Sequence, residues 1–113
     1  DNNMAQLSTK IELYAAANGV ASVDFTSDVM LQDDSNGAGA YIKEWNLDIA
    51  EPTDTQLASY ETTATTEEAN NVVISTRKAA YGSWETQLEE IYDDGIDSWK
   101  TRIAQVKTDN PKN

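Results

Sequence analysis

The sequence predicts an α+β fold with an N-terminal helix, a β-hairpin and then a C-terminal bundle of about three helices. Apolar residues recur at spacings of three and four near both ends of the chain, which is the period of an amphipathic helix. Between residues 20 and 47 strand-forming residues instead flank a turn-rich segment. The 113 residues fit a single domain, with a helix-plus-hairpin half (1–51) and a helical half (52–113).

The N-terminal helix is predicted from the segment MAQLSTKIELYAAANG. Met4, Leu7, Ile11 and Tyr14 fall on one stripe of a helix because they are three or four residues apart. Asn18-Gly19 tolerates the left-handed conformation that commonly ends a helix. We therefore expect a helix that runs from about Met4 to Asn18.

The hairpin is predicted from a dense turn signal, QDDSNGAGAY, between two strand-like runs. We expect residues 28–32 to pair with residues 41–46, and a short strand near residues 23–25 would make the sheet three-stranded. Strict alternation in the second strand divides it into two faces, one with Ile42 and Glu44 and the other with Tyr41, Lys43 and Trp45.

The helical half begins with two capping-box spacings. Thr53 with Gln56 predicts a short helix that ends within residues 59–62, and Thr65 with Glu68 predicts the start of a long helix. Gly82 should interrupt this long helix, and Gly95 should close it. A last helix is expected from about residue 97 to 108, ending before Pro111.

One apolar stripe is predicted to run along the long helix through Ala69, Val73, Thr76, Ala80, Trp84, Leu88 and Ile91. We expect Trp84, Leu88 and Ile91 to pack against Trp99 and Ile103. These residues would form the apolar contact, which we call the predicted clasp, between two helices joined by the tight turn at Gly95.

The charge is strongly acidic, with 20 acidic and 8 basic residues and a net charge of −12. Such a surface repels phosphate backbones and argues against nucleic-acid binding. No run approaches the ~18 apolar residues of a membrane span, and the acidic N-terminus is unlike a signal peptide, so we expect a soluble protein with no membrane partner. The four basic residues after residue 97 suit a helix C-terminus better than a dedicated docking patch.

The residues offer little to catalysis, because the chain has no His and no Cys. Adjacent acidic pairs are common, but a catalytic carboxylate needs burial or a close like charge. The calcium-loop pattern aligned on Gly37 fails at its first and last ligands, which would be Gln32 and Lys43. We therefore expect no catalytic residue, metal or cofactor. A small hydrolase built on a carboxylate pair is the enzyme alternative, and it requires a buried, pKa-shifted Asp or Glu in a cleft.

A partner is the better expectation for a chain with a modest apolar content of 39%. Aromatic side chains anchor interfaces, so the candidate partner-binding residues are the aromatics whose burial the pattern does not assure: Tyr41, Trp45, Tyr60, Tyr92 and Trp99. For Trp45 packing in the core of the hairpin is the stronger alternative. A second copy of the chain, giving a homo-oligomer, is one candidate partner.

The C-terminal stretch, residues 77–112, resembles a domain found in tail proteins of tailed bacteriophages. Its spaced elements are R-x-x-x-Y-P/G, Q-L-(D/E), an aromatic residue with Asp, a Trp, and I-x-x-(V/I)-K-x-x-x-P-K. The matching residues are Arg77, Tyr81-Gly82, Gln87-Leu88-Glu89, Tyr92-Asp93, Trp99, Ile103, Val106-Lys107 and Pro111-Lys112. The segment DDSNGAGAYIKEWNLDIAEPT, residues 33–53, resembles the strand-turn-strand that precedes a Pro-Thr helix start in such proteins.

This resemblance implies a non-enzymatic tail assembly chaperone or a small tail-associated protein. Its partners would be other tail or tail-fibre proteins of a phage. Two alternatives stay open: an adaptor retained in the tail of the virion, and a chaperone that acts in the cytoplasm of the infected cell and leaves.

Overall fold

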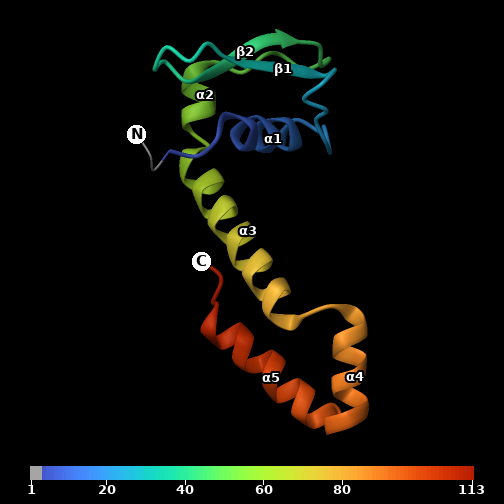
Figure 1. Cartoon of the computed structure of the whole chain (residues 1–113). Helices are drawn as coiled ribbons and strands as arrows, with labels where there is room; N and C mark the ends of the chain where they lie inside the picture. Colours follow the sequence, from blue (N-terminus) through green and yellow to red (C-terminus); the bar gives the residue numbers. More distant parts are fainter. Residues whose placement is uncertain (1–3) are drawn as a thin grey trace. The chain divides into compact units, whose positions relative to one another are not determined.

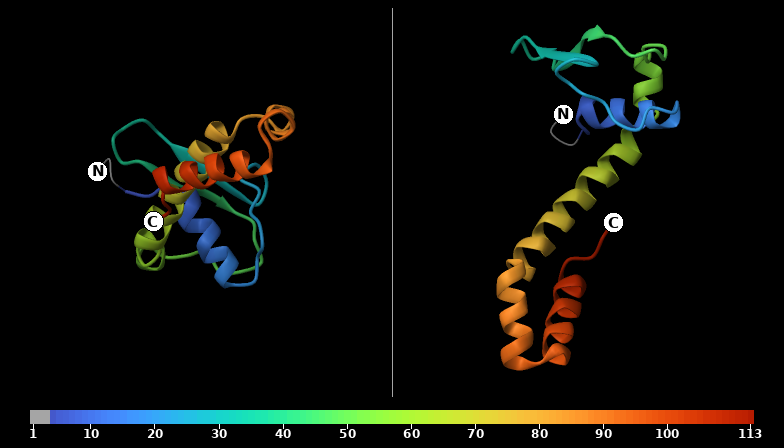
Figure 2. Two further views of the ribbon diagram at one scale, coloured as in Figure 1. Left: turned by 90° about the horizontal axis from the view of Figure 1, so that it is seen from below. Right: turned by 90° about the vertical axis from the view of Figure 1, so that its right-hand side faces the viewer.

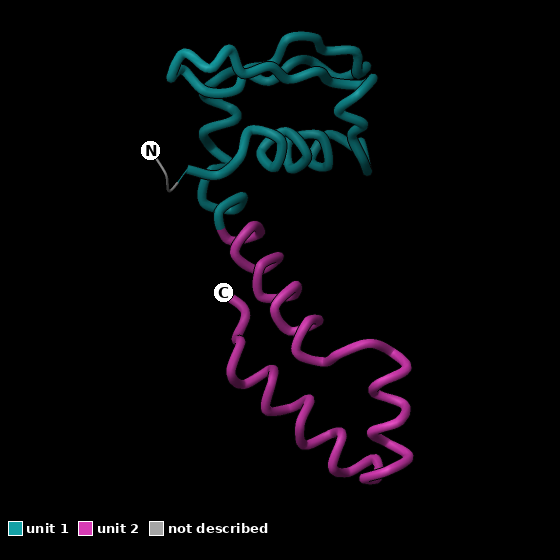
Figure 3. The backbone as a smooth tube through the Cα atoms, viewed as in Figure 1, with its two compact units in different colours: residues 1–65 teal, residues 66–113 magenta. Residues whose placement is uncertain are grey.

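The computed structural model describes residues 4–113. Helix α1 (Leu7–Ala17) is followed by strands β1 (Val29–Asp33) and β2 (Ala40–Trp45), and then by α2 (Asp54–Ala58), α3 (Glu61–Tyr81), α4 (Trp84–Asp94) and α5 (Ile96–Asp109) (Figure 1). This order confirms the predicted α+β fold. The chain forms two compact units, residues 1–65 and residues 66–113, and α3 begins in the first and ends in the second (Figure 3).

Helix α1 lies across one face of the hairpin within the first unit (Figures 1 and 2). Its buried side packs Ile11 against Val29 of β1 and Leu57 of α2, and these three residues form the core. The helix ends as predicted, because Gly19 takes a φ of 89°. The N–H of Val20 then donates to the carbonyl of Ala15 at 2.8 Å, which is the bonding of a Schellman end.

The predicted start of this helix is three residues too early. Helix α1 begins at Leu7, and Met4 precedes it with 59% of its surface exposed. Met4 is therefore absent from the buried stripe that contains Ile11 and Tyr14.

The sheet has two antiparallel strands, and its register contains a bulge. Met30 pairs with Glu44 whereas Leu31 pairs with Ile42, so Lys43 is an extra residue in β2. A bulge interrupts the alternation of faces. Ile42 and Trp45 consequently both pack against the core, and the prediction that they occupy opposite faces is wrong.

The third strand expected near residues 23–25 is not formed in the described part of the chain. The backbone there turns instead, and the carbonyl of Asp24 accepts the N–H groups of Asp28 at 2.8 Å and Val29 at 3.2 Å. Val23 and Phe25 still pack against the core. Their strand-like composition thus reflects burial in a connecting loop, not pairing.

Helix α2 has the predicted capping box. The N–H of Gln56 donates to Oγ1 of Thr53 at 3.1 Å, and the N–H of Thr53 donates to Oε1 of Gln56 at 2.8 Å. Helix α3, however, begins at Glu61 and not at Thr65. The carbonyl of Tyr60 already accepts the N–H of Ala64 at 2.8 Å, so Thr65 lies inside the helix and caps nothing.

In the second unit, both predicted glycine breaks are confirmed. Helix α3 ends before Gly82 (φ 85°), and Oγ of Ser83 accepts the N–H of Thr86 to start α4. Gly95 (φ 87°, ψ 159°) separates α4 from α5. The predicted clasp is wrong for Trp84 and Leu88, whose surfaces are 71% and 47% exposed. Because α4 restarts at Ser83, the stripe of α3 does not continue in phase along α4.

Candidate partner-binding surfaces

Helix α4 exposes a row of large apolar side chains, which we call the α4 stripe: Trp84, Leu88 and Tyr92. Their exposed fractions are 71%, 47% and 90%. Residues four apart lie above one another on a helix, so the three side chains share one side of α4. The helix carries five acidic residues and no basic ones. Glu85, Glu89 and Asp93 each follow a stripe residue and flank the stripe along one edge.

The end of α3 and the C-terminal segment form a depression of about 340 Å³, which we call the cationic hollow. It is lined by Ile74, Arg77, Lys78, Tyr81 and Lys112, and no acidic residue contributes to it. Ile74 is 46% exposed. Nε of Arg77 donates to the carbonyl of Asn110 at 2.8 Å, so this guanidinium also fastens the C-terminal end of α5 to α3.

One arginine of α5 contacts both other helices of the second unit. Arg102 donates from Nε and Nη2 to the two carboxylate oxygens of Glu90, both at 2.7 Å. It also donates to the carbonyls of Ala80 and Tyr81 at the end of α3, both at 2.9 Å. The planar guanidinium therefore joins three helices, and neither α4 nor α5 has a buried side chain.

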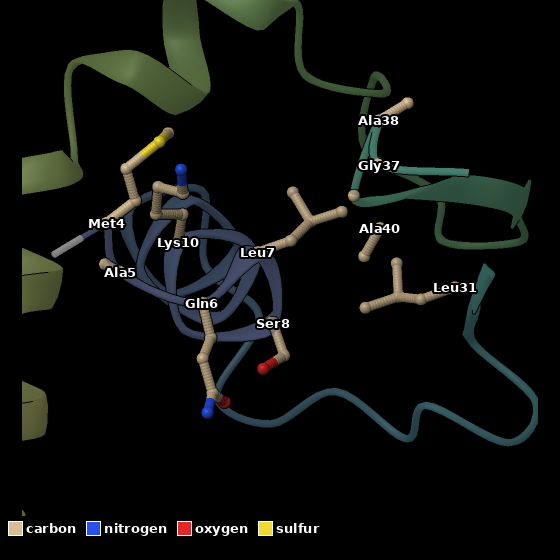
Figure 4. A pocket seen from close by; sticks show the side chains of 11 residues that line it. Met4, Ala5, Gln6, Leu7, Ser8, Lys10, Leu31, Gly37, Ala38 and Ala40 are labelled. Carbon is tan, nitrogen blue, oxygen red and sulfur yellow. The ribbon is translucent and has the colours of Figure 1, made fainter. Parts of the chain in front are cut away.

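The first unit has a hollow of about 550 Å³ between the start of α1 and the hairpin loop (Figure 4). Most of the side chains around it are small or apolar. The lining residues are Met4, Ala5, Gln6, Leu7, Ser8, Lys10, Leu31, Gly37, Ala38, Gly39 and Ala40. Nζ of Lys10 lies 3.1 Å from Oε1 of Glu61, so its charge is already paired.

The carboxylates whose pKa is shifted all have a lowered pKa, because their surroundings stabilise the charged form. The N–H of Ala5, followed by Lys10, lowers the pKa of Glu61, and hydrogen bonds from Thr26 lower the pKa of Asp24. Hydrogen bonds from Arg102 lower the pKa of Glu90. A general acid needs the opposite shift. Residues 4–113 also contain no group of three or more acidic side chains placed to hold a metal ion.

Three of the five predicted partner-binding residues lie in the first unit. Trp45 packs against the core, 6.3 Å from the ring of Tyr14, and its Nε1 donates to the carbonyl of Ile49. Tyr41 is 41% exposed, and its hydroxyl donates to Asp34. Tyr60 is half-buried between α2 and α3. A partner would thus reach Tyr41 more readily than Trp45 or Tyr60.

The other two predicted residues lie in the second unit and differ in exposure. Tyr92 belongs to the α4 stripe, whereas Trp99 is half-buried and donates from Nε1 to Oε1 of Gln87 at 3.1 Å. Trp84 and Leu88 were not predicted as surface residues, because the periodicity of α3 was expected to continue through Gly82. Counting the period afresh from Ser83 would have aligned both of them with Tyr92.

Several residues that carry the C-terminal resemblance have structural roles within the second unit. Arg77 caps the end of α5, and Gln87 accepts from Trp99 while its Nε2 donates to the carbonyl of Gly82 at 3.0 Å. Their spacing therefore follows from how α3, α4 and α5 are joined. None of the helices described in residues 4–113 combines the length and the apolar character needed to cross a membrane.

A comparison with known protein families covers the hairpin and its flanking helices. Residues 12–69, just over half of the chain, match the family described as XkdW protein, which is phage-related. The matched range contains residues 33–53, which carry the hairpin resemblance, and ends before residue 77. No curated protein and no solved structure matches the chain.

Proposed function

Because the chain belongs to the XkdW family of phage-related proteins, we propose that it is a small, non-enzymatic structural or adaptor component of the phage tail that remains in the virion. The observation that carries this proposal is the α4 stripe. Trp84 is 71% exposed and Tyr92 is 90% exposed, in a unit whose helices α4 and α5 have no buried residue. Apolar surface of this kind is typical of chains that are covered in an assembly.

The chemistry of the acidic side chains supports the non-enzymatic part of the proposal. A carboxylate-pair hydrolase requires one carboxyl group with a raised pKa. Asp24, Glu61 and Glu90 have lowered values, each because hydrogen-bond donors hold the charged form.

A second candidate is a tail or tail-fibre assembly chaperone that leaves before the particle is complete. The net charge of −12 favours it, because a large charge of one sign opposes aggregation while an exposed apolar surface binds a client. Both candidates require binding to other phage proteins, and they differ in whether that contact is permanent.

Quantitative mass spectrometry of purified, extensively washed phage particles tests the proposal. We expect the protein in a fixed ratio to the major tail protein, and in the same ratio after further washing. An abundant cytoplasmic phage protein measured in the same particles is the control for carry-over. If the protein falls to the level of that control while it is abundant in the lysate, the adaptor proposal is wrong and the chaperone is favoured.

A further inference from the structure

We propose that copies of this chain bind one another, with the α4 stripe of one copy seated in the cationic hollow of another. Both surfaces lie in the second unit, and their residues do not overlap. The inference concerns self-association, and it stands whether the protein stays in the virion or leaves.

The side chains of the α4 stripe are left exposed by the rest of the second unit. Residues 66–113 form a compact unit, yet the side of α4 that faces α5 presents Gln87, Glu90 and Ile91, not the large rings. A unit of this size without a disulfide or a structural metal commonly depends on association for its stability. Trp84 and Tyr92 would contribute the largest buried area.

Charge decides which surface can be that cover. Two α4 helices placed against each other would bring ten acidic side chains together, because each helix has five and no basic residue to offset them. The cationic hollow has the opposite composition, with Arg77, Lys78 and Lys112 and no acidic lining residue. Complementary charge of this kind orients partners and suppresses wrong pairings.

The size and the side chains of the cationic hollow suit the α4 stripe of a second copy. Its volume of about 340 Å³ lies at the lower end of the range for small-ligand pockets, which suits a single inserted side chain. Ile74 and Tyr81 offer apolar contact, and lysine or arginine beside an aromatic ring adds a cation–π attraction. Tyr92 and Trp84 are the rings available, while Glu85, Glu89 and Asp93 would meet the lysines.

The two contact surfaces are different, so the contact is heterologous unless two copies exchange both contacts about a two-fold axis. Each copy has one stripe and one hollow, and a copy that loses one surface keeps the other. Association either closes into a reciprocal pair or continues from copy to copy. In both arrangements it should weaken as salt rises, because much of the contact is between exposed charges.

The test uses two variants of the full chain, each blocked at one surface. Trp84→Ala combined with Tyr92→Ala removes the stripe, and Lys78→Glu combined with Lys112→Glu reverses the hollow. Arg77 is left in place because it holds Asn110. Lys100→Glu is a control charge reversal on an exposed position of α5 outside the hollow. Circular dichroism verifies that each variant is folded.

Analytical ultracentrifugation over a range of protein and salt concentrations gives the readout. We expect self-association of the unsubstituted chain and of Lys100→Glu, and at least about a tenfold loss of affinity in each blocked variant. The decisive measurement is the mixture of the two blocked variants, which should form a 1:1 complex and grow no further. This happens because one variant keeps the hollow and the other keeps the stripe.

Three results would overturn the inference. The first is an unsubstituted chain that stays monomeric at every concentration and salt. The second is self-association that neither blocked variant weakens. The third is a mixture in which the blocked variants fail to bind each other, since this would show that the stripe and the hollow do not meet.

Discussion

At the scale of single residues, the two units use different means of stabilisation. The first unit buries Ile11 and Val29 completely and places aromatic rings around them. In the second unit hydrogen bonds join the helices, among them those of Arg102, whose guanidinium reaches the side chain of Glu90 and two backbone carbonyls. Substitutions should therefore act through cavity formation in one unit and through lost polar bonds in the other.

Replacement of Ile11 tests the role of the core. Ile11→Ala should lower the free energy of unfolding by about 2–5 kcal/mol, because it leaves a cavity at a fully buried position. Val72→Ala, at a position that is 65% exposed, should change it by less than about 0.5 kcal/mol. Urea titration followed by circular dichroism measures both. Equal effects of the two substitutions would contradict the assignment of Ile11 to the core.

The pair of Glu90 with Arg102 should make stability depend on acid pH. Because the folded-state pKa of Glu90 is lowered, its contribution is fully present above the ordinary glutamate pKa and is lost as the pH falls through the folded-state value. We expect Glu90→Gln to remove that part of the pH dependence, and to destabilise the protein at neutral pH.

Glu89→Gln is the matched control, since Glu89 is the neighbouring residue on an exposed position of α4. Melting temperatures measured from neutral to acid pH compare the two variants. A pH profile that is unchanged by Glu90→Gln, or that is changed equally by Glu89→Gln, would show that Arg102 does not control this titration.

At the scale of helices and strands, breaks at glycine and the capping box of α2 were more predictable from the sequence than the starts of α1 and α3 or the faces of the elements. Local hydrogen bonds decide an end, so the capping box at Thr53 and the breaks at Gly82 and Gly95 could be predicted from neighbouring residues. Which side chains face the core depends on every bulge or helix break that comes earlier in the same stretch of chain. One extra residue at Lys43 moved Trp45 toward the core, and the restart at Ser83 moved Trp84 away from α5.

Gly95 gives a prediction at this scale. Its φ of 87° with ψ of 159° belongs to a region that is essentially restricted to glycine. Gly95→Ala should therefore cost about 1–3 kcal/mol and weaken the junction of α4 with α5. Ser98→Ala, at an exposed position in the first turn of α5, serves as the control and should be nearly neutral. Thermal melts of both variants measure the difference, and a neutral Gly95→Ala would mean that the turn has another conformation.

At the scale of the whole molecule, apolar burial and charge are unevenly divided. Among the described residues 4–113, the buried residues all lie before residue 66, in the first unit. Residues 1–65 also carry 11 acidic and 2 basic residues, whereas residues 66–113 carry 9 and 6. The candidate surfaces could be predicted only in part, because Tyr92 has an obvious ring in an acidic helix but the hollow assembles from residues far apart in the sequence.

This division predicts an uneven pattern of amide hydrogen exchange. In dilute solution the amides of α1 and of the β1–β2 ladder should exchange more slowly than those of α4 and α5, because regions with few buried apolar contacts open locally at lower cost. Mass spectrometry of peptides after exchange in deuterated buffer gives the comparison. Equal or greater protection of α4 and α5 in dilute solution would contradict the prediction.

The bulge in β2 also constrains how this protein can change over evolutionary time. Gain or loss of a single residue between Ile42 and Trp45 would reverse the direction of the tryptophan and remove it from Tyr14. Lineages should therefore keep the length of this strand, or alter it two residues at a time. In the exposed loop at residues 34–39, side chains do not alternate between two faces. The length of this loop is therefore free to change by one residue at a time.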